Sequence, residues 1–265
     1  MTRLFLILVF GIPWLLLPQP MARAESLEYV FGAASGTVKG FDFAALENSS
    51  SKKVIRGGGL QINHVGQKVP LPSVGGKTRF GLRGDFEIEL SFLVEELGIP
   101  TSGDGSGIML RLEYADKEQS GLTLALNASP NELLFWQIDN TTNGQQNHQV
   151  DKRPAFTNVF ESPQTIRVKR SGGQITAIAG AAETNTEFSS PVFTNADVSS
   201  VAMWISTGGA SADMAVELKR LRIADEFAND IAAPSGASSW TIIFWVFAVL
   251  LGLAGAYWYW QTLQP

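Results

Sequence analysis

Hydrophobic and polar residues alternate along most of the central part of the chain. Apolar side chains occupy every second position from Phe86 to Phe92 and again from Ile108 to Tyr114, with mostly polar residues between them. This period of two is typical of strands that have one buried and one exposed face. Similar runs cover residues 59–64, 122–126, 133–138, 165–170, 174–178, 201–205 and 214–223. The pattern places Phe86, Ile88, Leu110 and Ile166 in the core.

Glycine-containing turn signals separate these runs. They lie at residues 57–59, 75–76, 104–105, 143–144, 171–173 and 208–209. Short strands joined by such turns indicate an antiparallel β-sandwich. No stretch of 12 or more residues between the runs keeps a helical period of 3.6, so we expect an all-β domain. There is also no internal repeat that would indicate a propeller or a solenoid.

The first 24 residues have the features of a secretory signal. Residues 1–3 include a positive charge, residues 4–17 are apolar and uncharged, and residues 22–24 place alanine at the two positions that signal peptidase requires to be small. We expect a mature chain that begins at Glu25. An uncleaved anchor is the alternative, but the apolar run is short for a membrane span and Pro13 interrupts it.

The C-terminal residues 240–260 contain no charged side chain. A helix of this length is about 31 Å long, which matches the hydrocarbon core of a bilayer, and aromatic residues at both ends favour its interfaces. We expect a transmembrane helix with the lipid bilayer as its partner; a buried core helix is the alternative. The predicted organisation is therefore a signal peptide (1–24), a β-domain (25–228), a linker (229–239), a transmembrane helix (240–260) and a cytoplasmic tail (261–265).

Charge and cysteine content limit the possible functions of the β-domain. Removing residues 1–24 takes away Arg3 and Arg23, which leaves 18 basic and 25 acidic side chains and a formal charge of −7. This charge disfavours nucleic acid as a partner. The absence of cysteine excludes disulfides and thiolate metal sites and is typical of an exported bacterial protein. The Gly-rich stretches lack the lysine and helix of a phosphate-binding loop, so no nucleotide is expected.

Three segments of the domain resemble a known superfamily. Residues 84–92, 107–112 and 165–175 look like strands of the concanavalin A-like lectin/glucanase superfamily, and are closest to its laminin-G-like bacterial members. The resemblance covers residues 60–223. It implies a jelly-roll of two curved antiparallel sheets, and a role in binding glycans, cleaving them or mediating adhesion.

Glu87 and Glu89 are the strongest candidates for hydrolytic chemistry. They project from one face of a predicted strand about 7 Å apart, within the range of carboxylate separations that glycosidases use. The resembled glucanases carry a third acid on this strand, but here that position falls on Ser91 or Phe92. We therefore expect no catalytic residue and interpret both glutamates as partners of basic residues across the sheet. The basic residues of matching parity are Arg111, Arg167 and Lys169.

Calcium is the cofactor that the resemblance makes worth considering. Its candidate ligands are Asp104, Asp116, Asp139 and Asp151, all in predicted loops. None lies in a dense run of ligands such as an EF-hand loop, so no cofactor is predicted and calcium stays open as an alternative.

The most polar part of the domain follows Trp136. Residues 139–149 are rich in amide and carboxylate side chains, and form either a binding loop or a solvated hairpin. Trp136 shares the parity of apolar neighbours, which favours the core, but it is also the one aromatic ring beside this polar stretch. The candidate ligand-binding residues are Trp136, Asp139, Asn140, Asn143, Gln145 and His148, together with Glu87, Glu89, Arg111 and Glu113 on a predicted polar face.

These features predict a membrane-anchored, extracytoplasmic binding or adhesion module of the bacterial envelope. Polysaccharide is the expected ligand class. A glycoside hydrolase on the same fold and a structural subunit of an envelope assembly are the alternatives.

Overall fold

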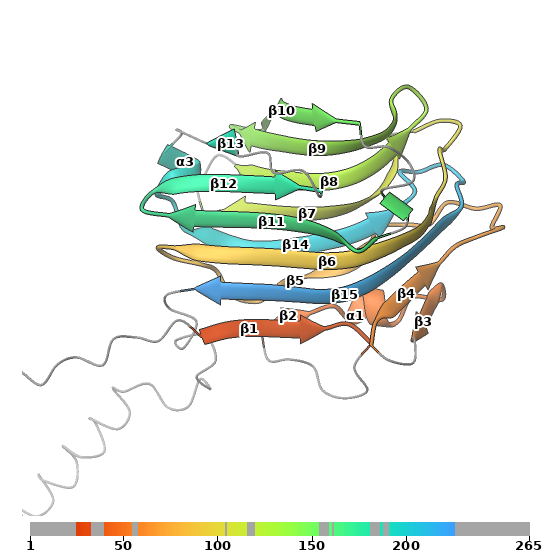
Figure 1. The fold of residues 1–265 in the computed structure, drawn as a ribbon, viewed down its shortest axis with the longest axis horizontal. Coiled ribbons are helices and arrows are strands. Elements are labelled where there is room, and N and C mark those ends of the chain that lie inside the picture. The colour runs from red at the N-terminus through yellow and green to blue at the C-terminus, as the bar shows by residue number, and fades with distance from the viewer. Residues whose placement is uncertain are drawn as a thin grey trace, which may run out of the picture.

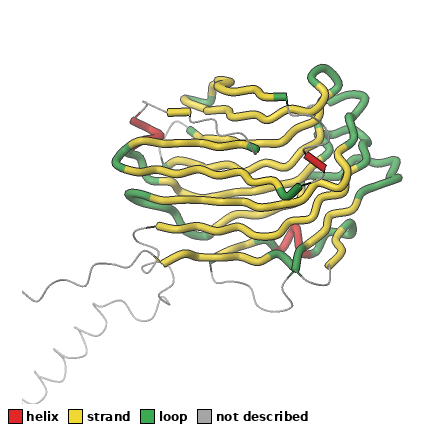
Figure 2. Tube along the Cα trace, viewed as in Figure 1, coloured by secondary structure: helices red, strands yellow, loops and turns green. Residues whose placement is uncertain are grey.

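The domain consists of two antiparallel β-sheets packed face to face (Figure 1). The computed structural model describes residues 25–32, 40–54, 58–103, 105–115, 120–153, 159–160, 162–180, 186–187 and 191–225. Strands dominate these ranges, and the named helices α1 (Ala44–Glu47) and α3 (Pro191–Thr194) are single turns (Figure 2). The predicted all-β class is therefore confirmed.

Sheet A contains eight of the described strands. Their order is β13-β12-β11-β6-β15-β4-β3, and β1 pairs with β15 beside β4. The bounds are β1 (Glu25–Val30), β3 (Lys52–Val54), β4 (Leu60–Asn63), β6 (Phe86–Leu97), β11 (Gln164–Ser171), β12 (Gln174–Ala179), β13 (Thr186–Glu187) and β15 (Met214–Asp225).

Sheet B contains the other seven described strands, in the order β10-β9-β8-β7-β14-β5-β2. The bounds are β2 (Phe41–Asp42), β5 (Val74–Thr78), β7 (Ser106–Tyr114), β8 (Gly121–Ser129), β9 (Leu133–Thr142), β10 (Gln145–Lys152) and β14 (Val198–Ser206). All of the predicted alternating runs coincide with strands of one sheet or the other.

Alternation along the strands produces the core between the sheets. The four residues predicted to be buried, Phe86, Ile88, Leu110 and Ile166, are at most 3% exposed and belong to one continuous apolar cluster. The intervening residues of β6, such as Glu87 and Glu89, face outward and are partly exposed. Each strand thus contributes one face to the core, as its period of two requires.

Two expectations about neighbouring elements are wrong. Gly75 and Gly76 do not form a turn but lie within β5, where a Cβ atom on either would overlap the backbone of an adjacent strand. The chain also crosses between the sheets after β6, so that β6 belongs to sheet A and β7 to sheet B. Glu87 and Glu89 therefore cannot share a polar face with Arg111 and Glu113, because the outer faces of the two sheets lie on opposite sides of the sandwich.

The long pairing of β6 with β15 defines two ends of the domain. Asp225 pairs with both Phe86 and Glu25, so the two chain ends of the described domain lie together; we call this the terminal end. Leu97 pairs with Met214 at the other end, where the loops 98–105 and 207–213 meet. We call this the loop end. The amide of Gly98 donates to the carbonyl of Asp213 there at 2.7 Å.

The predicted signal peptide (1–24), linker (229–239), transmembrane helix (240–260) and tail (261–265) lie outside the described residues. The helical segments within the described ranges are too short to span a bilayer.

Substitution of Phe86 tests the assigned facing of β6. We expect Phe86→Ala to lower the free energy of unfolding by about 3 to 5 kcal/mol, because it leaves a cavity in the core. Its neighbour Glu87 faces outward, so Glu87→Ala should cost less than about 1 kcal/mol. Urea unfolding of the purified protein measures both values. Equal losses would show that the strand faces are assigned incorrectly.

Candidate functional site

The outer face of sheet B brings several polar residues into register. His148 on β10 pairs with Asp139 on β9, which pairs with Thr123 on β8 and then with Arg111 on β7. Side chains of directly paired residues lie on the same face of a sheet. Asp139 therefore lies within a row of polar side chains, although its own side chain is only 2% exposed.

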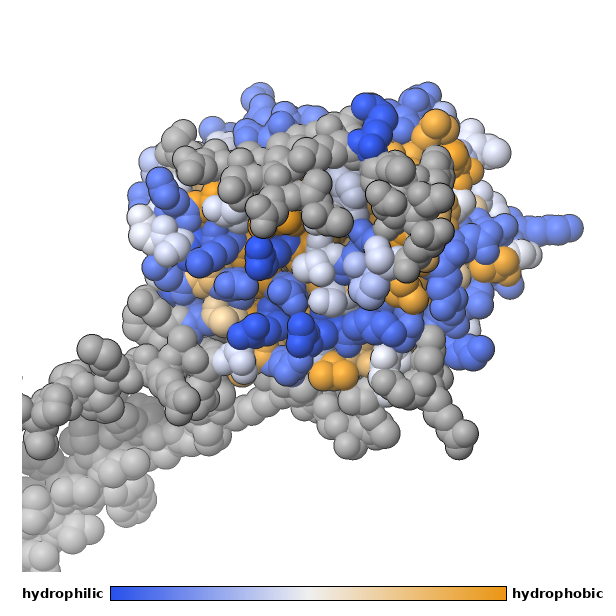
Figure 3. All heavy atoms as spheres, in the orientation of Figure 1, coloured by the Kyte–Doolittle hydropathy of each residue, from blue (hydrophilic) through white to orange (hydrophobic). Residues whose placement is uncertain are grey.

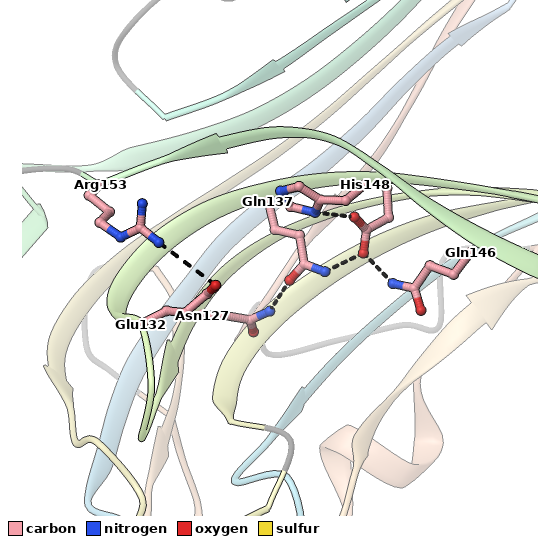
Figure 4. Close-up of polar contacts among 7 residues, drawn as sticks. Asn127, Glu132, Gln137, Gln146, His148 and Arg153 are labelled. Atoms are coloured by element: carbon pink, nitrogen blue, oxygen red, sulfur yellow. Dashed lines mark hydrogen bonds and ion pairs between the residues drawn. The ribbon is translucent and has the colours of Figure 1, made fainter.

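Asp139 is the centre of a connected network of hydrogen bonds (Figure 4). Its Oδ1 accepts from Nδ1 of His148 at 2.6 Å, and its Oδ2 accepts from the side-chain amides of both Gln137 and Gln146. The Nδ2 of Asn127 donates to Oε1 of Gln137 at 2.6 Å and extends the chain to β8. We call these five residues the Asp139 network. Three donors compensate the buried carboxylate for its lost hydration.

Donors and acceptors follow one order along the network, and this order explains the unpaired oxygen of Asn127 at its end. A carboxylate only accepts, so Gln137 must turn its amide nitrogen toward Asp139 and its oxygen toward Asn127. Asn127 then has to use its nitrogen, which leaves its Oδ1 over Gly107 buried and without a hydrogen-bond partner. Oδ1 of Asn127 is thus unpaired because Asp139 fixes the donor and acceptor order of the hydrogen bonds that lead to it.

A pocket of about 390 Å³ adjoins this network on the loop-end side of β9. Phe135 contributes apolar surface to it; this ring is 6% exposed and lies outside the main core cluster. Gln137 and His148 contribute polar groups, and the β8–β9 turn contributes Glu132. We call this cavity the Phe135 pocket. Its lining consists of Gly103, residues 129–132, Phe135, Gln137 and His148.

The electrostatic character of the pocket comes from an imidazole and a carboxylate. The His148 side chain is 47% exposed, and Glu132 lies 3.8 Å from Arg153 in an exposed ion pair. An exposed pair of this kind contributes little to stability, so a ligand could replace Arg153 as the partner of Glu132 at small cost. The pocket therefore combines an apolar surface with hydrogen-bonding groups and no buried cation among its lining residues.

The structure separates the predicted ligand residues of the β9–β10 region. Asp139 and His148 contact each other directly, as described above. Asn140 faces the opposite side of β9 and is buried. Asn143 and Gln145 lie at the exposed hairpin turn, near the terminal end and away from the pocket.

Trp136 is a core residue and is not available as the ligand contact that the sequence suggested. It is 4% exposed, its ring centroid is 6.4 Å from that of Phe92, and it packs closely against Gly180. Its side chain lies on the same face of β9 as those of Leu134 and Ile138, which is the face that packs between the sheets. No face of this ring is available to stack on a ligand.

The hairpin interpretation of residues 139–149 is confirmed. β9 continues to Thr142 and β10 begins at Gln145, so the turn consists of Asn143 and Gly144 alone. Both have positive φ, 55° and 74°, as a type I′ turn requires. Asp139, which we expected in a loop, consequently lies within a strand.

The remaining predicted residues have structural partners. Glu89 accepts from Nη2 of Arg220 at 3.0 Å, and is paired in register with Arg167 on one side. Arg111 donates to Oγ1 of Thr123 at 2.8 Å, and Glu113 accepts from the hydroxyl of Ser200 at 2.6 Å.

Glu87 and Glu89 belong to a charged surface on sheet A. In register, Lys169 lies opposite Glu87, and Arg222 lies opposite Glu89. Figure 3 shows hydrophilic side chains gathered over β6 and β15 on this face. The prediction of basic cross-strand neighbours is confirmed for Arg167 and Lys169, whereas Arg111 is on the other sheet.

Sequence reasoning missed the pocket residues Phe135, Gln137 and Glu132. A signal was present in β9, because Phe135 shares the parity of Gln137 and Asp139 rather than that of the core residues. An aromatic ring on the polar face of a strand is a candidate ligand contact. Asn127 could not be found in this way, since its role depends on which strand lies beside β9.

No group of three or more potential metal-ligating side chains is found among the described residues. Asp104 and Asp116 lie outside them, and the side chain of Asp151 is not described. Calcium binding stays an alternative that the family resemblance alone suggests.

Comparisons with known proteins identify the fold. No protein-family model and no curated protein matches the chain. A prokaryotic β-1,3-1,4-glucanase (lichenase) derived from a mouse hindgut metagenome has a TM-score of 0.50 and 10% identity, covering 76% of this chain and 99% of that chain. The β-glucanase of Bacillus licheniformis (TM-score 0.48, 10% identity, 76% and 97% covered) and lectin I from Ulex europaeus (0.43, 17%, 75% and 97%) are also similar. The predicted concanavalin A-like jelly roll is thus confirmed, and at this identity the likeness establishes the fold alone.

Two neighbouring glutamines provide a matched test of the Asp139 network. We expect Gln146→Ala to lower the free energy of unfolding by about 1 kcal/mol, because a hydrogen bond to a carboxylate is lost at an exposed position. Gln145→Ala should change it by less than about 0.5 kcal/mol, since that side chain is outside the network. Urea denaturation compares the two variants. A Gln145 effect as large as that of Gln146 would contradict the network.

Proposed function

We propose that this protein is a non-catalytic glycan-binding module that binds sugar in the Phe135 pocket on the outer face of sheet B. The observation that carries the proposal is the pocket itself: an aromatic ring, an amide and an imidazole line one cavity beside a rigid hydrogen-bond network. Sugars present apolar C–H faces and many hydroxyl groups. A site with apolar surface and a few oriented polar groups matches that chemistry.

The network supports binding by holding the polar groups in place before the ligand arrives. Gln137 and His148 both line the pocket and both donate to the buried Asp139. Side chains that are already ordered lose less conformational entropy when they bind a ligand. Weakly interacting ligands such as single sugars gain most from this arrangement.

The fold gives limited support to the ligand class. The similar lichenase is a β-1,3-1,4-glucanase and therefore acts on a glycan. That activity belongs to the lichenase, and a glycan is proposed for this chain because of the pocket.

A non-catalytic role is favoured over hydrolysis by the positions of the acids. Glu87 and Glu89 lie on sheet A, on the opposite side of the sandwich from the pocket, and Glu89 is paired with Arg220. A glycosidase of the usual type needs two carboxyl groups flanking one bond. In the pocket the lining carboxylate is Glu132, while the nearby Asp139 is buried and engaged by three donors.

Export and anchoring are part of the proposal and would present the pocket away from the membrane. The described domain begins and finishes at the terminal end, whereas residues 103 and 129–132 of the pocket lie at the loop end. A transmembrane helix at residues 240–260 would follow the terminal end. The pocket would then point toward ligands outside the cell.

Glycan-array binding by the purified protein tests the proposed site. Wild type should bind, and Phe135→Leu should weaken binding roughly tenfold because it removes the ring while keeping the site apolar. The control is the double variant Glu87→Gln/Glu89→Gln on sheet A, which should bind within about twofold of wild type. A complete absence of bound glycan, or loss of binding in the control alone, would contradict the proposed site.

The same variants decide between binding and hydrolysis. No reducing ends should appear when wild type is incubated with β-glucans, galactans or sulfated polysaccharides. Release of oligosaccharide that either glutamine substitution abolishes would establish a hydrolase with its acids on sheet A.

Processing and anchoring can be tested on the cellular protein. Mass spectrometry should find a mature chain beginning at Glu25, and carbonate washing should leave that chain in the membrane fraction. Deletion of residues 240–265 should release it. Detection of an intact Met1 would contradict cleavage, and retention of the deletion variant would indicate a second attachment.

A further inference from the structure

Because Asp139 only accepts hydrogen bonds, it determines which atoms the pocket wall offers to a ligand. Each of its three partners must turn a donor toward it. His148 therefore carries a proton on Nδ1, and Gln137 directs its amide nitrogen toward the carboxylate. The tautomer of His148 and the amide orientation of Gln137 therefore follow from their hydrogen bonds to Asp139.

One acceptor and one donor remain for the pocket. A neutral His148 with a proton on Nδ1 has Nε2 as an acceptor, and this atom has no partner within the described part of the chain. Gln137 spends one of its two amide hydrogens on Asp139 and retains the other. Both side chains line the Phe135 pocket, and the acceptor and the donor come from the neighbouring strands β10 and β9.

We propose that Asp139 is a positioning residue, and that the pocket it orders binds an uncharged sugar through two adjacent hydroxyl groups. The ligand assignment rests on the proposed glycan-binding function. One hydroxyl donates to Nε2 of His148 while its neighbour accepts from Gln137. Phe135 contacts the C–H surface of the ring, and the lining residues of the pocket include no lysine or arginine that would attract a sulfate or carboxylate group.

This arrangement makes binding sensitive to acid. Protonation of His148 turns Nε2 into a donor, and the hydroxyl loses its acceptor. The charged groups around this imidazole are Asp139 on β9 and Glu132 in the β8–β9 turn. Glu132 is paired with Arg153. Arg111 lies two strands beyond Asp139 in the same row. Protonation of His148 therefore weakens binding, because Nε2 can no longer accept a hydrogen bond from the sugar hydroxyl.

The two histidines of the chain allow a test that needs no ligand. Nε2 of His64 donates to the carbonyl of Val69 at 2.8 Å, so the two imidazoles have opposite tautomers. Nitrogen-15 NMR of the full-length protein, above the histidine titrations, should show one ring protonated on Nε2 and one on Nδ1. His148→Ala should remove the second signal. Two rings protonated on Nε2 would overturn the positioning role of Asp139.

Asp139→Asn tests the direction of control. Asparagine has only one side-chain oxygen. Both Gln137 and Gln146 donate to the Oδ2 position, so the oxygen should occupy that position and the new amide nitrogen should face His148. The imidazole must then accept at Nδ1 and move its proton to Nε2. We expect this tautomer switch with His64 unchanged, whereas Glu87→Gln, which also removes one carboxylate, should leave both rings as in wild type.

Isothermal titration with the methyl glycosides of glucose, galactose and mannose tests the ligand assignment. Wild type should bind at least one of them more tightly at neutral than at acidic pH, and Asp139→Asn should weaken binding tenfold or more and abolish this difference. Equal affinity at every pH, or preference for a sulfated or carboxylated glycoside, would overturn the proposed recognition. If no sugar binds at any pH, the glycan-binding function itself fails, and the NMR result still decides the role of Asp139.

Discussion

The pairing of β6 with β15 forms the middle of sheet A and defines the two ends of the sandwich. Both strands are twelve residues long, and their register extends from Phe86–Asp225 at one end to Leu97–Met214 at the other. Since they contribute continuous apolar faces to the core, their burial is a large part of the hydrophobic stabilisation. The same register sends both chain ends to one end of the sandwich and gathers the loops at the other.

A second constraint acts on the outer face of sheet B. Burying the carboxylate of Asp139 is tolerated because three donors surround it, and those donors come from two strands. Its acceptor-only chemistry then propagates through Gln137 to Asn127, where it leaves an unpaired oxygen. A single buried charge thus orients a polar surface several residues wide, next to the Phe135 pocket.

The two polar faces of the sandwich have different physical characters. On sheet A, opposite charges alternate across β11, β6 and β15, and partly exposed pairs such as Glu89 and Arg220 stabilise the surface only slightly. On sheet B, polar side chains surround the buried carboxylate of Asp139 and border a cavity. This contrast, more than the number of polar residues, is why the second face is the better candidate for binding.

Local pattern determined much of this protein from sequence alone. Alternation between Phe86 and Phe92 predicted both a strand and its buried face, and Asn143-Gly144 predicted a turn, because strand facing and turn conformation depend on neighbouring residues. The sequence could not reveal that β6 and β7 lie in different sheets, or that Asn127 sits beside Gln137, since both depend on pairing between distant segments. Parity correctly favoured Trp136 for the core, yet only the packed structure showed that Phe135, its neighbour, lines the pocket. The side chains of a strand are assigned to two faces by local geometry, but which of those faces borders a cavity is decided by the tertiary arrangement of strands and loops around it.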